Sequence, residues 1–346
     1  VVEGVAATGV TRAHGRATGV QTAHGTIEAE VVVNCAGIWA RQLGALAGVS
    51  IPLQAAEHYY LITDRMAGMH GDLPVLEDPS SYGYFREEGG GLMIGLFEPI
   101  SAPWKVGGVP GDFSFGEIAP DWDRMAPWLQ KAMARVPKSE NTGIRKFFCG
   151  PEAFTPDLRP VVGEAPELRN YFVAAGLNSI GILTGGGMGR VLAHWIVHGK
   201  PDVDVTAMHI DRLHAWQATP RYRQERIAET LGMVYRCHYP YQSLVTARGA
   251  KRSPLHARLA AQGAYFKDVS GWEGADWYAG AGHTAAVLRH SFGREAWFAN
   301  WQAEHEAARS GVILMDMSFM AKFTVEGPDA AALVARVSAN HVCGPV

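Results

Sequence analysis

The sequence is poor in the features that would assign it to several common classes of protein. Its 346 residues include only four cysteines, which are widely spaced and form no CxxC pair. This spacing favours reduced thiols in a cytoplasmic-type protein over a disulfide framework, and it offers no metal site. The formal net charge is -3 and no basic run stands out, which argues against a nucleic-acid-binding protein.

Long apolar runs are also absent. No run approaches the roughly 20 residues that a membrane span needs. The most apolar window, 181–197, is interrupted by three consecutive glycines, by Arg190 and by His194. No signal peptide is recognisable at the start of the chain. We therefore expect no membrane span and a cytoplasmic location, or the mitochondrial matrix if the source is eukaryotic.

A third absence concerns the beginning of the chain. The sequence starts at Val1 without Met and stops at Val346 in mid-pattern, so we interpret it as a fragment of a longer polypeptide. No strand followed by GxGxxG and a helix, the unit that cradles the ADP part of a dinucleotide, stands near its start. The glycine run 185–189 lacks the spacing of that motif and comes too late.

The composition that remains is that of an ordinary globular protein with two to three domains, with 47% apolar and 19% charged residues. After a β meander, a continuous apolar strand at 31–37 ends in glycine and precedes a helix at 39–47. A second strand, 171–176, also ends in glycine and leads through a loop and the glycine run to a helix at 190–198. Strands that are apolar on both faces are typical of a parallel α/β sheet. The sequence therefore predicts an α/β lobe that is interrupted by an insertion.

The intervening segment has a different pattern. Aromatic-rich strands are predicted at 58–63, 82–86 and 92–96, with a glycine-rich hairpin turn at 88–91, and a helix at 122–136. This pattern indicates an antiparallel sheet with one helix. Further along, the sequence predicts a helix at 220–231, a loop at 272–282, a helix at 304–310, and strands at 312–316 and 322–327 that open a new domain.

Four stretches stand in a characteristic order and spacing. They are VNCAGIWA at 33–40; EHYYLIT at 57–63 with PVL at 74–76 and YFRE at 84–87; GP at 150–151 with TPD at 155–157, Gly163 and NYFVAAGLN at 170–178; and DMS at 316–318 with KF at 322–323. In combination they resemble the dimethylglycine/sarcosine dehydrogenase family. The last stretch looks like the opening of the folate-binding, aminomethyltransferase-like domain of that family.

The resemblance implies an α/β fold with an antiparallel β substrate lobe, like that of FAD-dependent amine oxidases, plus the start of an aminomethyltransferase-like domain. The implied domains are an FAD-binding lobe at 1–50 and 150–200, incomplete at its N-terminus, a substrate-binding lobe at 51–149, a linking domain at 201–305, and the start of the folate-binding domain at 306–346.

The implied reaction is oxidative N-demethylation of a small N-methylated amino acid, of the dimethylglycine or sarcosine type, by hydride transfer to flavin N5. The one-carbon unit is then released as formaldehyde or passed to tetrahydrofolate. The sequence does not decide between oxygen and an electron-transfer flavoprotein as electron acceptor. Covalent flavin attachment is equally open, because the histidine that relatives use would precede Val1.

The resemblance also implies which residues touch the flavin. Ala36, Gly37 and Trp39 follow the first glycine-ended strand, where ligands of open α/β sheets bind. Val2 stands where relatives place a backbone contact to the adenine. Taken alone, Gly37 is as well explained by the turn of the chain into the helix.

The second strand end supplies further cofactor-binding candidates: Gly176, Leu177, Asn178, Gly181 and Ile182. A helix N-terminus carries about half a positive charge and free N–H groups. Directed at the flavin N1/C2=O edge, it would stabilise the anion formed on reduction. A glycine-rich loop that only lets the helix pack on the sheet is the alternative explanation.

His58 and Tyr84 are the catalytic candidates that the resemblance implies. An amine must lose its proton before hydride leaves the neighbouring carbon, and an imidazole can accept that proton. The Tyr84 hydroxyl can hydrogen-bond the substrate amine or carboxylate. Without the resemblance, His58 would be a structural strand residue and Tyr84 a core aromatic. Tyr82, two positions earlier on the same predicted strand face, and Arg86, a possible carboxylate ligand, stay as alternatives.

Two other functions remain open. A non-catalytic regulatory subunit of the pyruvate dehydrogenase phosphatase type has this same architecture, although the presence of both His58 and Tyr84 argues mildly against it. An aminomethyltransferase with a vestigial oxidase half is the third reading.

Overall fold

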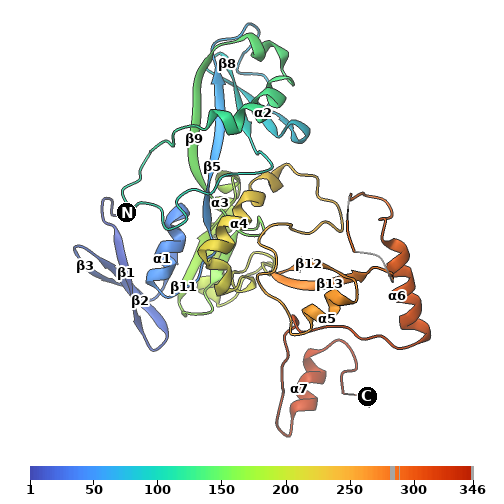
Figure 1. Cartoon of the computed structure of the whole chain (residues 1–346). Coiled ribbons are helices and arrows are strands. Elements are labelled where there is room, and N and C mark those ends of the chain that lie inside the picture. The colour runs from blue at the N-terminus through green and yellow to red at the C-terminus, as the bar shows by residue number, and fades with distance from the viewer. Residues whose placement is uncertain (281–284, 288, 344–346) are drawn as a thin grey trace. The chain divides into compact units, whose positions relative to one another are not determined.

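A computed structural model describes residues 1–280, 285–287 and 289–343 of the chain. The chain divides into two compact units: Val1–Ala250 with Arg289–Glu295, called unit 1 here, and Lys251–Leu288 with Ala296–Val346, called unit 2. In Figure 1, unit 1 takes up the blue to yellow part of the ribbon and unit 2 most of the orange and red part.

The α/β part of unit 1 is built on a three-stranded sheet in the order β10-β11-β4. β4 (Val32–Asn34) runs parallel to β11 (Tyr171–Ala175), and β10 (Val161–Glu164) runs antiparallel to β11. The two strands that were predicted to end in glycine, β4 and β11, are therefore direct neighbours. Because they are parallel, the chain leaves both of them at the same edge of the sheet.

The end of β4 is fixed by the fully buried side chain of Asn34. Its Nδ2 donates to the Ala40 carbonyl and to the Tyr171 hydroxyl, both at 2.9 Å, and its Oδ1 accepts from the Ala36 N–H at 3.1 Å. These bonds turn the chain into η1 (Gly37–Trp39) and α1 (Ala40–Leu46). The predicted strand and helix are thus confirmed, with one 3-10 turn between them.

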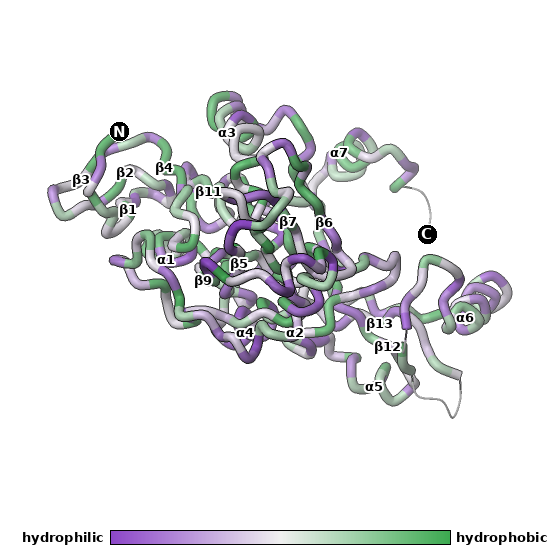
Figure 2. Tube along the Cα trace, turned by 90° about the horizontal axis from the view of Figure 1, so that it is seen from above, coloured by the Kyte–Doolittle hydropathy of each residue, from purple (hydrophilic) through white to green (hydrophobic). Residues whose placement is uncertain are grey.

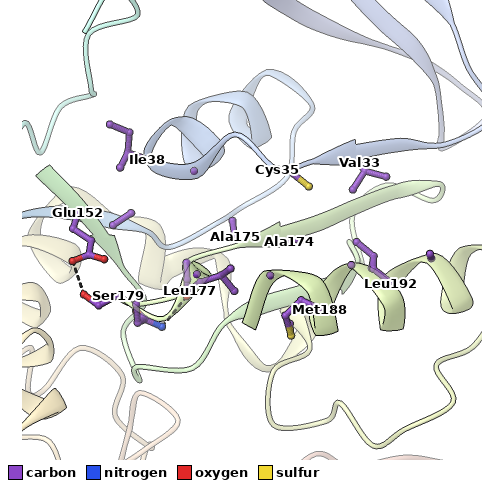
Figure 3. Close-up of a pocket in the computed structure, with 18 of the residues that line it drawn as sticks. Val33, Cys35, Ile38, Glu152, Ala174, Ala175, Leu177, Ser179, Met188 and Leu192 are labelled. Atoms are coloured by element: carbon purple, nitrogen blue, oxygen red, sulfur yellow. Dashed lines mark hydrogen bonds between the residues drawn. The ribbon is translucent and has the colours of Figure 1, made fainter. Parts of the chain in front are cut away.

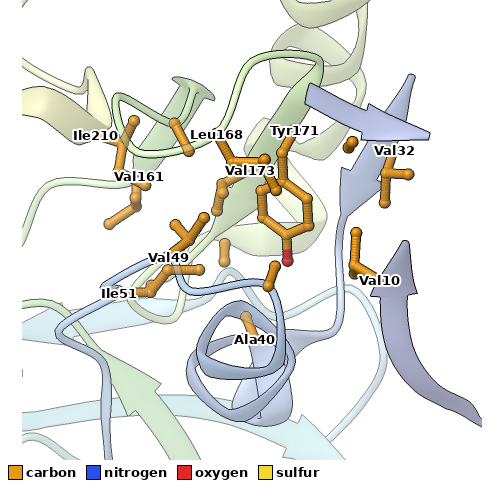
Figure 4. Close-up of a cluster of buried hydrophobic side chains, with 14 of the residues drawn as sticks. Val10, Val32, Ala40, Val49, Ile51, Val161, Leu168, Tyr171, Val173 and Ile210 are labelled. Carbon is orange, nitrogen blue, oxygen red and sulfur yellow. The ribbon is translucent and has the colours of Figure 1, made fainter. Parts of the chain in front are cut away.

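The apolar core of this part fills the space between the sheet, α1 and the start of a β meander. Figure 4 shows Tyr171, Val173 and Val32 of the sheet facing Ala40 of α1, with Val10 beside them. The meander consists of β1 (Ala7–Ala13), β2 (Arg16–Thr22) and β3 (Gly25–Glu28). Its first turn, His14-Gly15, has two positive φ angles, 51° and 73°, as a tight hairpin of this type requires.

A second, antiparallel sheet has the order β6-β7-β8-β5-β9. Its strands are β5 (Gln54–Thr63), β6 (Leu76–Asp78), β7 (Gly83–Glu88), β8 (Gly91–Leu96) and β9 (Ile144–Phe154), with η2 (Pro79–Ser81) between β6 and β7. Helix α2 (Trp122–Met133), capped by Asp121, covers one face and is followed by η3 (Pro137–Asn141). Alternate side chains along β5, β7 and β8, among them Tyr59, Leu61, Phe85 and Ile94, form the core beneath it. The other face carries His58, Tyr60, Tyr84 and Glu152.

Helix α3 (Gly181–His198) differs from the prediction of a loop followed by a helix from 190. The glycine run lies inside the helix. Intrinsic propensity disfavours glycine there by about 1 kcal/mol per residue. Packing outweighs this preference, because Met188, Leu192, Trp195 and Ile196 form a cluster with Val162 and Phe172 of the sheet.

The rest of unit 1 is mostly helical. It contains η4 (Ile210–Arg212), η5 (Ala215–Ala218), α4 (Pro220–Thr230) and η6 (Gly232–Val234), and α4 confirms the helix predicted at 220–231. Two buried arginines of α4, Arg223 and Arg226, face β5 and its surroundings. Arg223 donates to the Gln54 side chain and to the carbonyls of Val106 and Ala218, and burial lowers its pKa to about 10.

Unit 2 contains α5 (His256–Ala261), a hairpin of β12 (Ala264–Val269) and β13 (Trp272–Tyr278), α6 (Phe298–Ser310) and α7 (Ala330–Val337). Helix α6 has no buried residue and is largely hydrophilic along the tube of Figure 2. It begins at 298, six residues before the predicted start.

Two predictions for unit 2 are wrong. The loop predicted at 272–282 is a strand as far as Tyr278, because it pairs with 264–269; residues 281 and 282 lie outside the described part of the chain. The strands predicted at 312–316 and 322–327 are not formed. Val312, Leu314 and Phe323 are almost fully exposed, and no described residue pairs with this backbone, so the apolar pattern has nothing to pack on.

Within the described ranges, no helix has both the length and the apolar character needed to cross a membrane.

Candidate active site

A cavity of about 630 Å³ opens between the carboxyl ends of β4 and β11, the N-terminal half of α3 and the end of β9. Figure 3 shows its walls: Val33 and Cys35 at the end of β4, Ile38 after it, Ala174, Ala175 and Leu177 around the end of β11, and Met188 and Leu192 on α3. Gly37 and Gly176 both line it. The two glycine-ended strands of the sequence therefore meet at one cavity.

The loop after β11 is held in a constrained conformation. Gly176, Asn178 and Ser179 have positive φ angles of 64°, 49° and 68°. The buried Asn178 side chain accepts from the Thr155 N–H at 2.9 Å and donates to the Gly176 carbonyl at 2.7 Å. A Cβ at position 176 would lie 2.6 Å from both Leu53 and Thr155. Asn178 thus fixes the loop, while Gly176 and Gly181 reach the cavity wall.

The N-terminus of α3 lies beside this loop. Gly181 lines the cavity, and no side chain caps the first turn of the helix. The first N–H groups of an uncapped 18-residue helix offer donors and a partial positive charge to an anionic or acceptor group.

His58, Glu152 and Ser179 form one hydrogen-bonded group at the edge of the cavity. His58 Nδ1 lies 2.5 Å from Glu152 Oε2, and the Ser179 hydroxyl donates to the same oxygen at 2.5 Å, as Figure 3 shows for Ser179. Burial raises the pKa of Glu152, but the bonds from His58 and Ser179 outweigh it and hold that pKa below its ordinary value. Glu152 and Ser179 line the cavity, whereas His58 lies behind Glu152.

Tyr84 lies on the same face of the antiparallel sheet as His58. Both rings pack on Phe97, at centroid distances of 5.9 Å for Tyr84 and 4.7 Å for His58. Two glycines leave the space that the aromatic rings on this face occupy. A Cβ at Gly95 would lie 1.8 Å from the Tyr84 ring, and one at Gly150 would lie 2.8 Å from the Phe148 ring. Burial, followed by the negative charge of Glu152, raises the pKa of Tyr84.

The two alternatives to Tyr84 lie elsewhere. The expectation that Tyr82 shares its strand face is wrong, because Tyr82 precedes β7 with a φ of 58° and packs on Trp128 of α2. Arg86 is half exposed and donates to Glu88 at 2.6 Å.

Several predicted cofactor residues do not line the cavity. Trp39 donates through its indole N–H to the Pro110 carbonyl at 2.9 Å, and Ala36 packs against the core of the α/β part. Ile182 and Val2 are largely exposed. Of the predicted set, Gly37, Gly176, Leu177, Asn178 and Gly181 share the cavity.

Sequence reasoning missed Glu152 and Ser179. Both lie within or beside stretches that carried the family resemblance, GP at 150–151 and NYFVAAGLN at 170–178, but neither was weighed as a site residue. The signal available was a carboxylate directly after Gly150-Pro151, on the strand that pairs with His58. Recognising it required the register, since His58 lies opposite Gly150.

An apolar cavity at the carboxyl edge of an α/β sheet, with an antiparallel sheet beside it, defines the fold class of the FAD-dependent amino-acid oxidases. Comparison with known proteins agrees. The family model "FAD dependent oxidoreductase" matches residues 1–195, "FAD dependent oxidoreductase central domain" matches 198–253, and "GCVT N-terminal domain" matches 255–345. The chain belongs to the FAD dependent oxidoreductase family and also carries a match to the GCVT N-terminal domain.

Three individual relatives show how far the similarity extends. The chain is 42% identical to 4-methylaminobutanoate oxidase (formaldehyde-forming) of Paenarthrobacter nicotinovorans over 95% of its length and 40% of that protein. It is 36% identical to human mitochondrial sarcosine dehydrogenase, over 91% of this chain and 37% of the relative. It is also 34% identical to the mouse mitochondrial pyruvate dehydrogenase phosphatase regulatory subunit, over 92% and 37%. The chain thus spans about 40% of the length of these relatives.

The fold is also found in a solved structure. L-amino acid deaminase from Proteus vulgaris, at 17% identity, superposes with a TM-score of 0.50 and covers 60% of this chain and 57% of the deaminase.

Proposed function

We propose that this chain is part of an enzyme that oxidatively N-demethylates a small N-methylated amino acid, with FAD as the cofactor. One observation carries the proposal. The two glycine-ended strands meet at one cavity whose edge holds a carboxylate bonded to an imidazole. The substrates in the names of the curated relatives are N-methylated amino acids, in keeping with this function.

The residues around the cavity fit a flavin. Its walls are mostly apolar, as an isoalloxazine ring needs. Gly37 has a φ of 55° and no atom within 4 Å of a Cβ added there, so a ligand can approach the backbone closely. Gly37, Gly176, Leu177, Asn178 and Gly181 would hold the ring, and the first turn of α3 would face its anionic edge. FAD, when bound, would accept a hydride from the N-methyl carbon.

The antiparallel sheet supplies the substrate side. His58, Tyr60, Tyr84 and Phe148 lie on the face turned away from α2, and Tyr60 stacks on Phe148 at 4.5 Å. In this proposal His58 takes up the proton of the substrate amine, and Tyr84 orients the substrate by a hydrogen bond from its hydroxyl. Exclusion of water by the aromatic rings strengthens both interactions.

Several finer points belong to the same proposal. The carbon removed leaves as formaldehyde or passes to tetrahydrofolate bound by the GCVT-type domain, and an electron-transfer flavoprotein or oxygen takes the electrons. Cytoplasm, or the mitochondrial matrix in a eukaryote, remains the predicted location. The domain division 1–50 with 150–200, 51–149, 201–305 and 306–346 also stays a proposal. The β12–β13 hairpin in unit 2 and the GCVT match from 255 favour an earlier start for the last domain.

Flavin bleaching tests this function. The full-length protein should purify yellow, and anaerobic addition of sarcosine, dimethylglycine or 4-methylaminobutanoate should bleach its absorbance. His58→Ala should slow bleaching by at least about 100-fold, in the range of a lost general base.

Because the chain is also similar to a regulatory subunit, the absence of bleaching would point to a different function. A yellow protein that no N-methylated amine bleaches would favour the regulatory function. Folate-dependent turnover without flavin reduction would favour an aminomethyltransferase with a vestigial oxidase half.

A further inference from the structure

Glu152 is the charged group that the cavity presents. Among the lining residues, all of which the structure describes, it is the only one with a charged side chain. Its neighbours are Pro151, Ala153, Gly176 and Leu177, so the carboxylate stands in an apolar wall. A charge in such a place is costly unless it meets a partner of opposite sign.

His58 is less accessible than its role in the proposed reaction would suggest. The side chain is 16% exposed, its Nδ1 is bonded to Glu152, and its Nε2 is buried with no hydrogen-bond partner among the described residues. The Phe97 ring packs against the His58 ring, with 4.7 Å between the ring centroids. A cationic substrate in the cavity would therefore meet Glu152 before it meets His58.

We propose that Glu152 is the residue that binds the substrate ammonium and holds His58 in the form that can take up its proton. This inference rests on the proposed function and extends it to a residue of the same site. An N-methyl amino acid carries its positive charge on the nitrogen that must be deprotonated. The Glu152 carboxylate pairs with that ammonium and accepts the Nδ1–H of His58, which leaves the unpartnered Nε2 of His58 as the nitrogen that takes up the proton. The negative charge of Glu152 stabilises the imidazolium so formed, and the amine is left neutral with its lone pair free.

The surroundings of Glu152 support this step. Ser179 fixes Oε2 from the loop side, and His58 fixes it from β5, so the carboxylate has one orientation. Tyr84 on β7 is a further ionisable group near it, Cys35 at the end of β4 lines the same cavity, and the first turn of α3 has no acidic residue. No lysine or arginine lines the cavity, so none competes with a cationic ligand for the carboxylate.

The test compares a cationic and a neutral ligand on the full-length holoprotein. Sarcosine carries a positive charge on its nitrogen. (Methylthio)acetate, CH3–S–CH2–COO⁻, referred to as methylthioacetate, has the same shape but a neutral sulfur in place of that nitrogen. Glu152→Gln should raise the dissociation constant of sarcosine by 10-fold or more and leave that of methylthioacetate within about 2-fold. Isothermal titration and the perturbation of flavin absorbance both report these constants.

The rate of bleaching gives a second readout. In Glu152→Gln, the acidic limb of reduction rate against pH should move to higher pH, because solution must then supply the neutral amine. Glu152→Asp keeps the charge and should recover part of the sarcosine affinity. Glu117→Gln removes an exposed carboxylate that pairs with Lys146 of β9, and this variant should behave as the unaltered protein.

The possible outcomes distinguish a failure of this inference from a failure of the proposed function. If Glu152→Gln weakens both ligands equally, or changes neither binding nor the pH profile, Glu152 has no role in handling the ammonium. If the unaltered protein bleaches while Glu152→Gln behaves identically, the proposed function stands and this inference is wrong. If the unaltered protein does not bleach with any N-methylated amine, the function and the inference fall together.

Discussion

At the residue scale, this protein uses glycine for two distinct reasons at the same cavity. Gly37 and Gly176 both have left-handed φ angles, 55° and 64°. Space around Gly37 is open, whereas a Cβ at Gly176 would collide with Leu53 and Thr155. A side chain at 37 would thus strain only the backbone, and one at 176 would strain the backbone and overpack the core.

Replacing each glycine with alanine should separate these two reasons. Gly37→Ala should lower the free energy of unfolding by about 1–2 kcal/mol through the left-handed conformation alone. Gly176→Ala should lower it by roughly a further 1–3 kcal/mol because Leu53 and Thr155 must move. Urea unfolding of the full-length protein measures both values, and equal losses would mean that the loop shifts to relieve the contact.

At the scale of elements, helix α2 is tied to its sheet by one buried charge cluster. Arg124 of α2 donates to Glu98, beyond the end of β8, at 2.8 Å and to Glu57 of β5 at 3.1 Å. Glu98 is fully buried. Burial raises its pKa, and the ion pair with Arg124 only partly opposes this. Glu57 directly precedes His58 on β5, so the cluster also fixes the strand that carries His58.

Removing the arginine should therefore leave an uncompensated buried carboxylate. Arg124→Met should cost about 3–5 kcal/mol of unfolding free energy at neutral pH. A raised folded-state pKa means that Glu98 destabilises the fold more as pH rises through that pKa, and less once it is protonated at low pH. The loss should therefore shrink on acidification.

The control for this prediction is the double variant Arg124→Met with Glu98→Gln, which has no buried charge. Thermal unfolding at pH 5 and pH 8 should show a strong pH dependence for Arg124→Met and a weaker one for the double variant. A loss for Arg124→Met that does not change with pH would assign the effect to lost packing on Tyr59, whose ring lies 5.0 Å from the guanidinium.

At the scale of the whole molecule, the two compact units correspond closely to the matched family models. Unit 1 contains the cavity, and the matches to the two FAD-dependent oxidoreductase models end at 253. Unit 2 begins at 251, close to the start of the GCVT match at 255. If the proposed function is right, a ligand of the cavity and a folate should therefore stabilise different parts of the protein.

Calorimetry of the full-length protein tests this division. 5-Formyltetrahydrofolate and methylthioacetate, each at about 100 times its dissociation constant, should add roughly 2.7 kcal/mol to the part they bind. For parts of 150–250 residues this is a rise of about 5–10 °C in one transition and none in the other. A single transition that both ligands raise equally would show that the two parts unfold together.

The sequence by itself determined the family, the two glycine-ended strands, the antiparallel insertion and the candidates His58 and Tyr84. These follow from local pattern, since a continuous apolar strand, a glycine stop or a hairpin turn is written in a few neighbouring residues. The same local logic misplaced the start of α3, because the helix is formed by packing on Phe172 and Val162 in spite of its glycines. It also missed β13, which depends on pairing with 264–269.

Only the tertiary structure decided what stands at the edge of the cavity. Glu152 and Ser179 are 27 positions apart, and Glu152 and His58 are 94 positions apart. Strand register places His58 opposite Gly150, and the parallel pairing of β4 with β11 brings Gly37 to Gly176. Such contacts are set by the packing of distant segments, which leaves no periodic trace in the sequence, so the carboxylate that lines the cavity could be identified only from the fold.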